Sequence, residues 1–263
     1  MGAKKSPKLY REKQITLKTK SKYGLLGKNI SYSFSKNYFT AKFDNPVFEG
    51  CTYENFDIQS IAEFPNVLAQ NRDLNGLNVT IPYKESILPY LDRLSKTATE
   101  IGAVNVIKFT KKGTLKGYNS DWYGCKKSLQ PYLKPHHKKA VLLGTGGASK
   151  AIAYALQKLD ITATFVSRNP AENELSYNQL TKTIFDEYQL IINCTPLGTS
   201  PNNDTFPPIP YEYITPSHLV FDLVYNPEKT VFLKQAEAQG ATIVNGYEML
   251  IFQAEKAWKL WHK

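Results

Sequence analysis

Apolar, strand-like runs alternate with helical stretches along most of this 263-residue sequence, and this alternation limits its fold more than any other feature. It begins at Tyr23 and continues to the C-terminus without an internal repeat. Alternation of this kind predicts a parallel or mixed sheet with helices on both faces. The length allows one large domain or two of ordinary size. We therefore expect an α/β fold.

The first half of the chain predicts five strands and three helices. We expect strands at 23–27, 51–56, 77–81, 103–109 and 114–118, and helices at about 35–43, 60–70 and 83–101. The sequence Lys-Lys-Gly at 111–113 separates the last two strands and indicates a hairpin.

A second unit is expected after Asp121, and it follows the same alternation. A helix at 122–129 and a polar connector precede apolar strands at 140–144, 162–166, 190–195, 219–224 and 242–245. Helices are expected at 151–159, 231–238 and 247–261, with a proline-rich loop between Pro196 and Pro216. Two α/β domains that meet near residue 121 are the natural interpretation.

The charge of the chain is concentrated at its N-terminus. The net charge is +10, but residues 1–22 contain eight basic residues and one acid, so the remaining 241 residues carry only +3. A short basic arm before a near-neutral body is typical of a solvated, disordered extension rather than a phosphate-tracking surface. Trp258 and Trp261 lie three residues apart on the last helix and are expected to pack inward. We expect no nucleic-acid partner.

The sequence also argues against a membrane span, export and a metal centre. It contains no run of eighteen apolar residues and no apolar region typical of a secretory signal. Cys51, Cys125 and Cys194 are odd in number and lack metal-ligand spacing, and the four histidines show none either. We expect a cytoplasmic protein with reduced cysteines and no metal.

A glycine-rich turn between a strand and a helix is the first candidate site. Gly144, Thr145, Gly146, Gly147 and Ala148 follow the strand at 140–144, where glycines bring backbone N–H groups close to a pyrophosphate. The spacing is GxGGxxxA rather than GxGxxG, so a turn that needs glycine only for its backbone remains an alternative.

The next strand indicates which dinucleotide is preferred. It ends at Ser167, Arg168 and Asn169, where an NAD enzyme would place an acid for the ribose hydroxyl, and no acid occurs before Glu172. Arginine suits a 2′-phosphate because its planar guanidinium forms bidentate hydrogen bonds. This pattern favours NADP over NAD, although an arginine that only caps a loop is the other interpretation.

Candidate chemistry in the first half lies near the end of a strand. In the sequence GLNVTIPYK, the period of two places Asn78 and Thr80 on one face, and Lys84 follows in a loop opened by Pro82. Taken alone, Lys84 could be a solvated charge. The sequences GAVN, ending at Asn105, and GYNSD, ending at Asp121, add polar residues near the expected domain junction, where clefts usually form.

These segments together resemble the shikimate dehydrogenases of aromatic amino-acid and chorismate biosynthesis. Eight motifs match that family in order and spacing across residues 23–263: YGLLGKNISYSFS, GLNVTIPYK, GAVN, GYNSDWYG, LLGTGGASKA, INCTPLG, DLVYNP and NGYEMLIFQA. The resemblance implies a substrate-binding and catalytic domain at 23–120 with 246–263, and a Rossmann-like, doubly wound NADP-binding domain at 121–245. It also implies that the last helix packs back on the substrate domain.

The resemblance carries roles to individual residues. It implies that Lys84 and Asp121 form the catalytic pair, and that Ser33, Ser35 and Tyr225 hold the substrate carboxylate. Ring hydroxyls would be contacted by Thr80, Asn105 and Gln253, with Asn78 beside them. The nucleotide would be lined by the turn at 144–148, by 167–169, and by Thr195, Leu223 and Gly246.

Four positions depart from the family pattern. The chain has Tyr32 and Lys36 where the family often has histidine and proline, Ser120 where it has threonine, and Ser167 where it has asparagine. None of these removes a group on which the chemistry depends. They bear on affinity and on how the carboxylate is held.

The resemblance implies an NADP-dependent reduction of 3-dehydroshikimate to shikimate by a monomer or homodimer. Lys84 and Asp121 could divide the acid and base roles in more than one way. Two alternatives stay open: a quinate/shikimate dehydrogenase of the same fold, and a non-catalytic NADP(H)-binding sensor, which would be expected to lack a catalytic residue.

Overall fold

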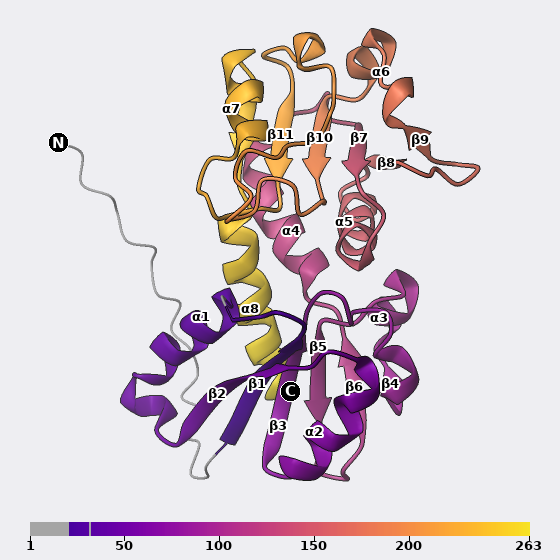
Figure 1. The fold of residues 1–263 in the computed structure, drawn as a ribbon. Helices are drawn as coiled ribbons and strands as arrows, with labels where there is room; N and C mark the ends of the chain where they lie inside the picture. Colours follow the sequence, from indigo (N-terminus) through magenta and orange to yellow (C-terminus); the bar gives the residue numbers. More distant parts are fainter. Residues whose placement is uncertain (1–20, 32) are drawn as a thin grey trace, which may run out of the picture.

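The fold described here is that of a computed structural model, which covers residues 21–31 and 33–263 (Figure 1). Residues 1–20 of the expected basic extension lie outside the described residues. Ser21 and Lys22 do not belong to a disordered arm, because they open strand β1 (Ser21–Gly27). The Lys22 ammonium donates to Asn71 Oδ1 at 3.2 Å and lies 3.5 Å from a carboxylate oxygen of Glu54. The first strand therefore begins two residues earlier than predicted.

The first sheet is mixed and forms the core of an N-terminal lobe. Its strand order is β2-β1-β3-β5-β6-β4, with β1, β2 and β3 parallel and the β5–β6 hairpin antiparallel. The new strands are β2 (Cys51–Asp57), β3 (Leu74–Val79), β4 (Arg93–Leu94), β5 (Val106–Phe109) and β6 (Leu115–Tyr118). The helices of this lobe are α1 (Phe34–Phe43), α2 (Phe64–Gln70) and α3 (Lys96–Ile101).

The second sheet is parallel throughout and forms the core of a C-terminal lobe. Its order is β12-β11-β10-β7-β8-β9, the doubly wound arrangement in which the strand order reverses between β7 and β10. The strands are β7 (Lys139–Leu143), β8 (Thr162–Ser167), β9 (Leu175–Ser176), β10 (Leu190–Asn193), β11 (Leu219–Asp222) and β12 (Thr242–Val244). The arrowheads of β7, β10 and β11 point toward the N-terminal lobe (Figure 1).

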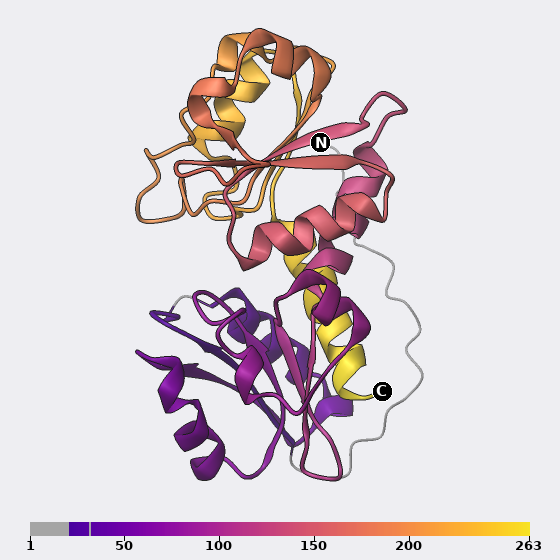
Figure 2. The same cartoon turned by 90° about the vertical axis from the view of Figure 1, so that its right-hand side faces the viewer.

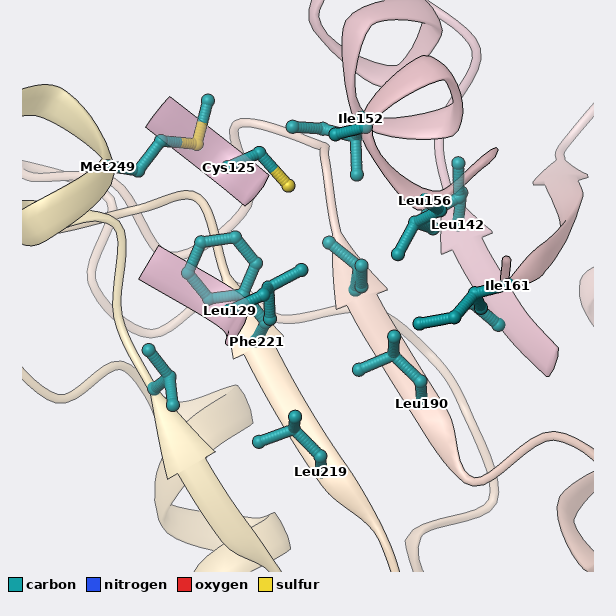
Figure 3. Packing of buried hydrophobic residues seen from close by; sticks show 14 residues of the cluster. Cys125, Leu129, Leu142, Ile152, Leu156, Ile161, Leu190, Leu219, Phe221 and Met249 are labelled. Carbon is teal, nitrogen blue, oxygen red and sulfur yellow. The ribbon is translucent and has the colours of Figure 1, made fainter. Parts of the chain in front are cut away.

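Helices cover both faces of the second sheet. One face packs against α4 (Asp121–Leu129), α5 (Gly147–Gln157) and the start of α8 (Tyr247–Trp261), in a cluster that includes Leu129, Ile152 and Met249 (Figure 3). The other face packs against α6 (Lys182–Glu187) and α7 (Val231–Ala238) through Phe185 and Phe232. Burial of these apolar side chains is the main force that holds the lobe together.

Two helices join the lobes. Helices α4 and α8 lie side by side, and α8 extends from the C-terminal lobe down to the first sheet (Figures 1 and 2). Its last turn buries Trp258 and Trp261 among Tyr23 and Phe39, and the Trp261 indole N–H donates to the Ile107 carbonyl oxygen at 3.1 Å. The inward packing of both tryptophans, and of the last helix on the first sheet, is confirmed.

The prediction of one helix from 83 to 101 was wrong. The chain forms turns after β3, a short 3₁₀ turn at Leu88–Tyr90, strand β4, and then α3. Pro89 has no N–H to continue an α-helix, and the Ser95 side chain accepts from the Ala98 N–H and starts a separate one. Between residues 171 and 189 the sequence predicts no helix or strand, whereas the structure has β9 and α6. No helix in the described part of the chain is both long enough and apolar enough to cross a membrane.

Candidate functional site

A cavity of about 320 Å³ lies where the two lobes meet. It is lined by all nine residues predicted for substrate binding and catalysis: Ser33, Ser35, Asn78, Thr80, Lys84, Asn105, Asp121, Tyr225 and Gln253. They come from the start of α1, from β3, from the loops after β3 and β11, from the segment just before β5, and from helices α4 and α8. Residues that are up to 220 positions apart in the sequence are therefore brought into one site.

Lys84 and Asp121 form an ion pair in this cavity. The Lys84 ammonium lies 2.8 Å from Asp121 Oδ2, and the two side chains are only 14% and 7% exposed. Asp121 is the first residue of α4, where the helix dipole favours a carboxylate. The pair places a proton donor beside a charge that orients it, at a position open to a small molecule.

Asn105 holds the other oxygen of that carboxylate. Its Nδ2 donates to Asp121 Oδ1 at 2.7 Å, and its Oδ1 accepts from the Ser120 backbone N–H at 2.6 Å. The Gln253 Oε1 lies 3.4 Å from the same amide nitrogen, which brings α8 into the network. Because buried polar groups with several partners are held in one geometry, the carboxylate is oriented before any substrate arrives.

Asn78 extends this hydrogen-bond network to β3. Its Nδ2 donates to the Asn105 carbonyl oxygen at 3.2 Å, and its Oδ1 accepts from the Tyr53 hydroxyl at 2.8 Å. Asn78 is 3% exposed. Two of its hydrogen-bonding positions are thus used inside the protein, and it contributes both to the cavity wall and to the position of Asn105.

The two predicted serines lie at the start of α1. Ser33 caps this helix, since its Oγ accepts from the Lys36 backbone N–H at 3.1 Å. That bond uses a lone pair and leaves the hydroxyl proton free to donate into the cavity. A proline at position 36 has no N–H and could not make this bond. The departure at Lys36 therefore has a structural consequence at Ser33.

Tyr225 closes the cavity from the C-terminal lobe. Its ring meets Phe34 edge to face, with the centroids 5.6 Å apart. Burial raises the pKa of the Tyr225 phenol, so the group remains a neutral hydrogen-bond donor at neutral pH.

The predicted nucleotide turn lies at the reversal of strand order in the second sheet. Gly144 has φ +106°, a conformation that favours glycine, and a Cβ on it would lie 3.2 Å from Thr195 Cγ2 in the loop after β10. Gly246 packs against the loop after β11, where a Cβ would lie 2.1 Å from the Leu223 carbonyl oxygen. Two pairs of predicted nucleotide positions, Gly144 with Thr195 and Gly246 with Leu223, are thus in close contact in loops that follow strands of this sheet, at the edge where doubly wound folds bind ligands.

The turn also has the features that a dinucleotide phosphate requires. Helix α5 begins without a side-chain cap. Its first N–H groups have no intrahelical acceptor and remain available to an anion. A Cβ on Gly146 would meet nothing within 4 Å, so the turn opens onto free space. The residues present fit a pyrophosphate.

Arg168 is exposed at the end of β8, beside Ser167 and Asn169. Its guanidinium makes no hydrogen bond or ion pair with the described residues, so its donors are available for a 2′-phosphate. The Asn169 backbone N–H donates to Ser167 Oγ at 3.2 Å, which shapes this short loop.

The two predicted sites adjoin each other. A Cβ on Gly147, the first residue of α5, would lie 3.3 Å from the Lys84 Cβ. The nucleotide turn therefore touches the loop that carries the proposed proton donor, which is the arrangement that transfer between two bound molecules needs.

The sequence interpretation missed several residues of the cavity wall. These are Leu25, Lys28, Asn29, Ile30, Phe34, Val79, Ile81 and Leu250. Lys28 and Asn29 follow β1 directly, and a polar pair at the end of a parallel strand could have indicated them. Within the described residues, no group of three or more His, Cys, Asp or Glu side chains could hold a metal ion.

Comparison with known proteins agrees with this geometry. Residues 25–107 match the shikimate dehydrogenase substrate binding domain. The NADP(+) shikimate dehydrogenase of Clostridium botulinum is 40% identical over 252 residues, which cover 90% of this chain and 95% of that protein. The shikimate 5-dehydrogenase of Thermus thermophilus, solved with NADP(H) and shikimate, is 29% identical with a TM-score of 0.80, over 91% of this chain and 92% of that one.

A quinate dehydrogenase shares the same architecture. The enzyme from Corynebacterium glutamicum, solved with NAD, is 26% identical and superposes with a TM-score of 0.81 over 92% of this chain and 94% of that one. The sequence similarity and the two-sheet architecture lead to one conclusion: this chain belongs to the shikimate dehydrogenase family.

Proposed function

We propose that this chain is an NADP-dependent shikimate dehydrogenase that interconverts 3-dehydroshikimate and shikimate. The observation that carries the proposal is the Lys84–Asp121 ion pair at 2.8 Å, in a small polar cavity that adjoins a dinucleotide-type turn. A buried ion pair of this kind is costly unless it is used or fully satisfied, and this one faces open space.

Lys84 is proposed as the proton donor. NADPH, when bound, would supply a hydride to the ketone carbon of 3-dehydroshikimate, so the ketone oxygen would need to gain a proton in the same step. The Lys84 ammonium donates this proton, which avoids the formation of a free alkoxide. In the oxidation direction the neutral Lys84 amine accepts the proton of the shikimate hydroxyl. Asp121 orients the amine and can accept a hydrogen bond from the same hydroxyl.

The remaining cavity residues are proposed to bind the ring. Ser33 and Ser35 donate to the substrate carboxylate at the N-terminus of α1, together with the Tyr225 phenol. Support for this assignment comes from the free hydroxyl proton that the helix cap leaves on Ser33. Ring hydroxyls would be bound by Thr80, Asn105 and Gln253, with Asn78 positioning Asn105.

The nucleotide is proposed to lie across the β7–β10 crevice. Its pyrophosphate would be bound by backbone N–H groups of the turn at 144–148, and its 2′-phosphate by Ser167, Arg168 and Asn169. Thr195, Leu223 and Gly246 would line the nicotinamide side. We assign the NADP-binding domain to 121–245, and the substrate domain to 23–120 with 246–263. Helix α4 of the first of these domains packs against helix α8 of the second, so the two domains are in contact through these helices.

We also propose a cellular compartment and an oligomeric state for this protein. Three free cysteines suit a reducing cytoplasm. A single chain supplies every residue of the proposed site, so either a monomer or a homodimer could work.

The direct test is shikimate-dependent reduction of NADP+, followed by the absorbance of the reduced cofactor, with NAD+ and quinate as parallel substrates. We expect turnover with shikimate and NADP+, and much lower kcat/KM with NAD+ or quinate. Faster oxidation of quinate would assign the quinate/shikimate alternative. Binding of NADPH without turnover on either acid would identify a sensor and contradict the proposal.

A further inference from the structure

Lys28 is a cation of the cavity wall to which the proposed mechanism gives no role. It follows Gly27 at the end of β1, lines the cavity with Ser33 and Ser35, and is exposed. Its ammonium forms no ion pair with any carboxylate among residues 21–31 and 33–263. A long, solvated lysine is ordinarily only a surface charge. A binding role for Lys28 is supported by the backbone around it and by the charge of the cavity.

The loop that carries Lys28 is held rigidly. The Asp57 carboxylate accepts from the Asn29 N–H at 2.8 Å and from the Ile30 N–H at 3.1 Å. The Asn55 amide donates to the Ile30 carbonyl oxygen at 2.9 Å, and the Lys28 N–H donates to the Ile81 carbonyl oxygen at 3.3 Å.

The backbone conformation of this loop is specialised as well. Asn29 adopts φ +56°, in the left-handed region that asparagine tolerates better than most residues. A side-chain carboxylate and amide thus fix a short loop in a conformation that few residues adopt. The result is that the base of the Lys28 side chain has a defined position at the cavity.

The charges within the cavity leave Lys28 unbalanced. Lys84 and Asp121 neutralise each other at 2.8 Å, and the Tyr225 phenol is neutral at neutral pH. The other polar lining groups are hydroxyls and amides, which carry no charge. Counted over these lining residues, the cavity therefore has a net charge of +1, which is that of Lys28. A ligand with one negative charge would neutralise the cavity.

We infer that Lys28 is a specificity-determining residue that selects the anionic carboxylate of the substrate over a neutral analogue. The serines and Tyr225 supply directional hydrogen bonds to that group, and Lys28 supplies the opposite charge. The inference rests on the proposed function, because it names the partner of the carboxylate at that same site. It assigns Lys28 a part in binding and none in the proton step.

The test combines a charge change in the protein with one in the substrate. Lys28→Gln is assayed with NADP+ against shikimate and against its uncharged methyl ester. We expect the KM for shikimate to rise about fivefold, with kcat changed less than about twofold, because an exposed charge contributes equally to ground and transition states. The KM for the ester should stay within about twofold of the wild-type value.

Two further variants complete the design. Lys28→Arg keeps the charge and should restore the KM for shikimate to within about twofold. Lys112→Gln removes an equal charge at the β5–β6 turn, outside the cavity, and should leave both substrates unaffected. In the wild type the KM for shikimate should rise with ionic strength more steeply than in Lys28→Gln, since salt screens an exposed cation.

An unchanged KM for shikimate in Lys28→Gln would overturn the inference. An equal rise for acid and ester would also overturn it, because that result indicates a general effect on the loop. Failure of the proposed function has a different signature, namely a wild-type protein that oxidises neither shikimate nor its ester.

Discussion

The proposed substrate side and the proposed nucleotide side of this molecule are built in opposite ways. On the substrate side Asn78, Asn105 and Asp121 are each at most 5% exposed and hydrogen-bond to one another or to neighbouring backbone. On the nucleotide side Thr145, Gly146 and Arg168 are exposed. Helix α5 starts there without a side-chain cap.

The difference indicates what each side contributes. Buried, mutually bonded groups are preorganised, so they can act on a developing charge without first rearranging. An open turn made of backbone N–H groups is completed by the ligand it binds. Changes on the substrate side should therefore reduce kcat, and changes on the nucleotide side should raise the KM for the cofactor.

The largest effect is expected at the ion pair. Lys84→Ala removes the proposed proton donor and should lower kcat about 10³-fold, within the range for loss of a general acid or base. Asp121→Asn, which keeps the shape of the side chain, should also lower kcat strongly because it removes the charge that orients the amine. Steady-state kinetics with shikimate and NADP+ measures both.

The control for this prediction is a binding measurement. Both variants should bind NADPH with nearly the wild-type Kd, since neither residue belongs to the nucleotide turn. Near-wild-type turnover in both variants would remove the ion pair from the mechanism.

The second prediction concerns a buried carboxylate beneath the nucleotide side. Asp222 is fully buried and accepts from the Thr230 hydroxyl at 2.6 Å, and from the Val224 N–H and the Asn193 amide at 3.0 Å each. Burial nevertheless raises its pKa from 3.8 to about 6.

The native state therefore binds a proton between about pH 4 and pH 6 that the unfolded state has lost, so this group lowers stability as pH rises through that window. The full effect is about 3 kcal/mol. We expect the free energy of unfolding of the wild type, minus that of Asp222→Asn, to fall by up to this amount from about pH 4 to about pH 7. Urea titrations at each pH measure the difference, and a flat difference would show that Asp222 titrates normally.

The third prediction tests the open side of the comparison. Arg168→Ala should raise the KM for NADPH about 30-fold and leave the KM for NADH nearly unchanged, because a bidentate bond to the 2′-phosphate is present only with the phosphorylated cofactor. Arg72→Ala removes an exposed arginine from the N-terminal lobe and serves as the matched control. An equal effect on both cofactors would mean that Arg168 does not bind the 2′-phosphate.

Most of the fold could be predicted from periodicity, and the exceptions have local causes. The helices at 231–238 and 247–261 were predicted at their observed bounds because their apolar positions recur at helical spacing and Thr230 caps the first. The stretch 83–101 also looks helical in composition. There Pro89 and the pairing of β4 with β6 decide the outcome, and strand pairing is a contact that no local pattern contains.

The candidate site likewise contains residues that the sequence predicted and residues that it did not. The nine predicted substrate-side residues came from motifs shared with a family, and all nine line one cavity. Lys28 and Phe34 lie within the first of these motifs, but the resemblance assigns them no role, and their place in the wall depends on how the loop at 28–30 is held. The Asp57 carboxylate that holds this loop is 27 residues away from Ile30, and nothing in the sequence near either residue indicates their contact.

The smallest effect is expected where the two sides meet. The Lys150 ammonium on α5 lies 2.7 Å from a carboxylate oxygen of Glu85, and the Tyr154 hydroxyl donates to Glu100 at 2.9 Å, so both bonds cross between the lobes. The Lys150 and Glu85 side chains are 40% and 44% exposed, so Lys150→Ala should change the free energy of unfolding by less than about 0.5 kcal/mol. Leu129→Ala, at a fully buried position of α4, should lower it by about 3 kcal/mol in the same urea titration. A loss from Lys150→Ala as large as that from Leu129→Ala would mean that surface charge, rather than the packing of α4 and α8, holds the substrate side against the nucleotide side.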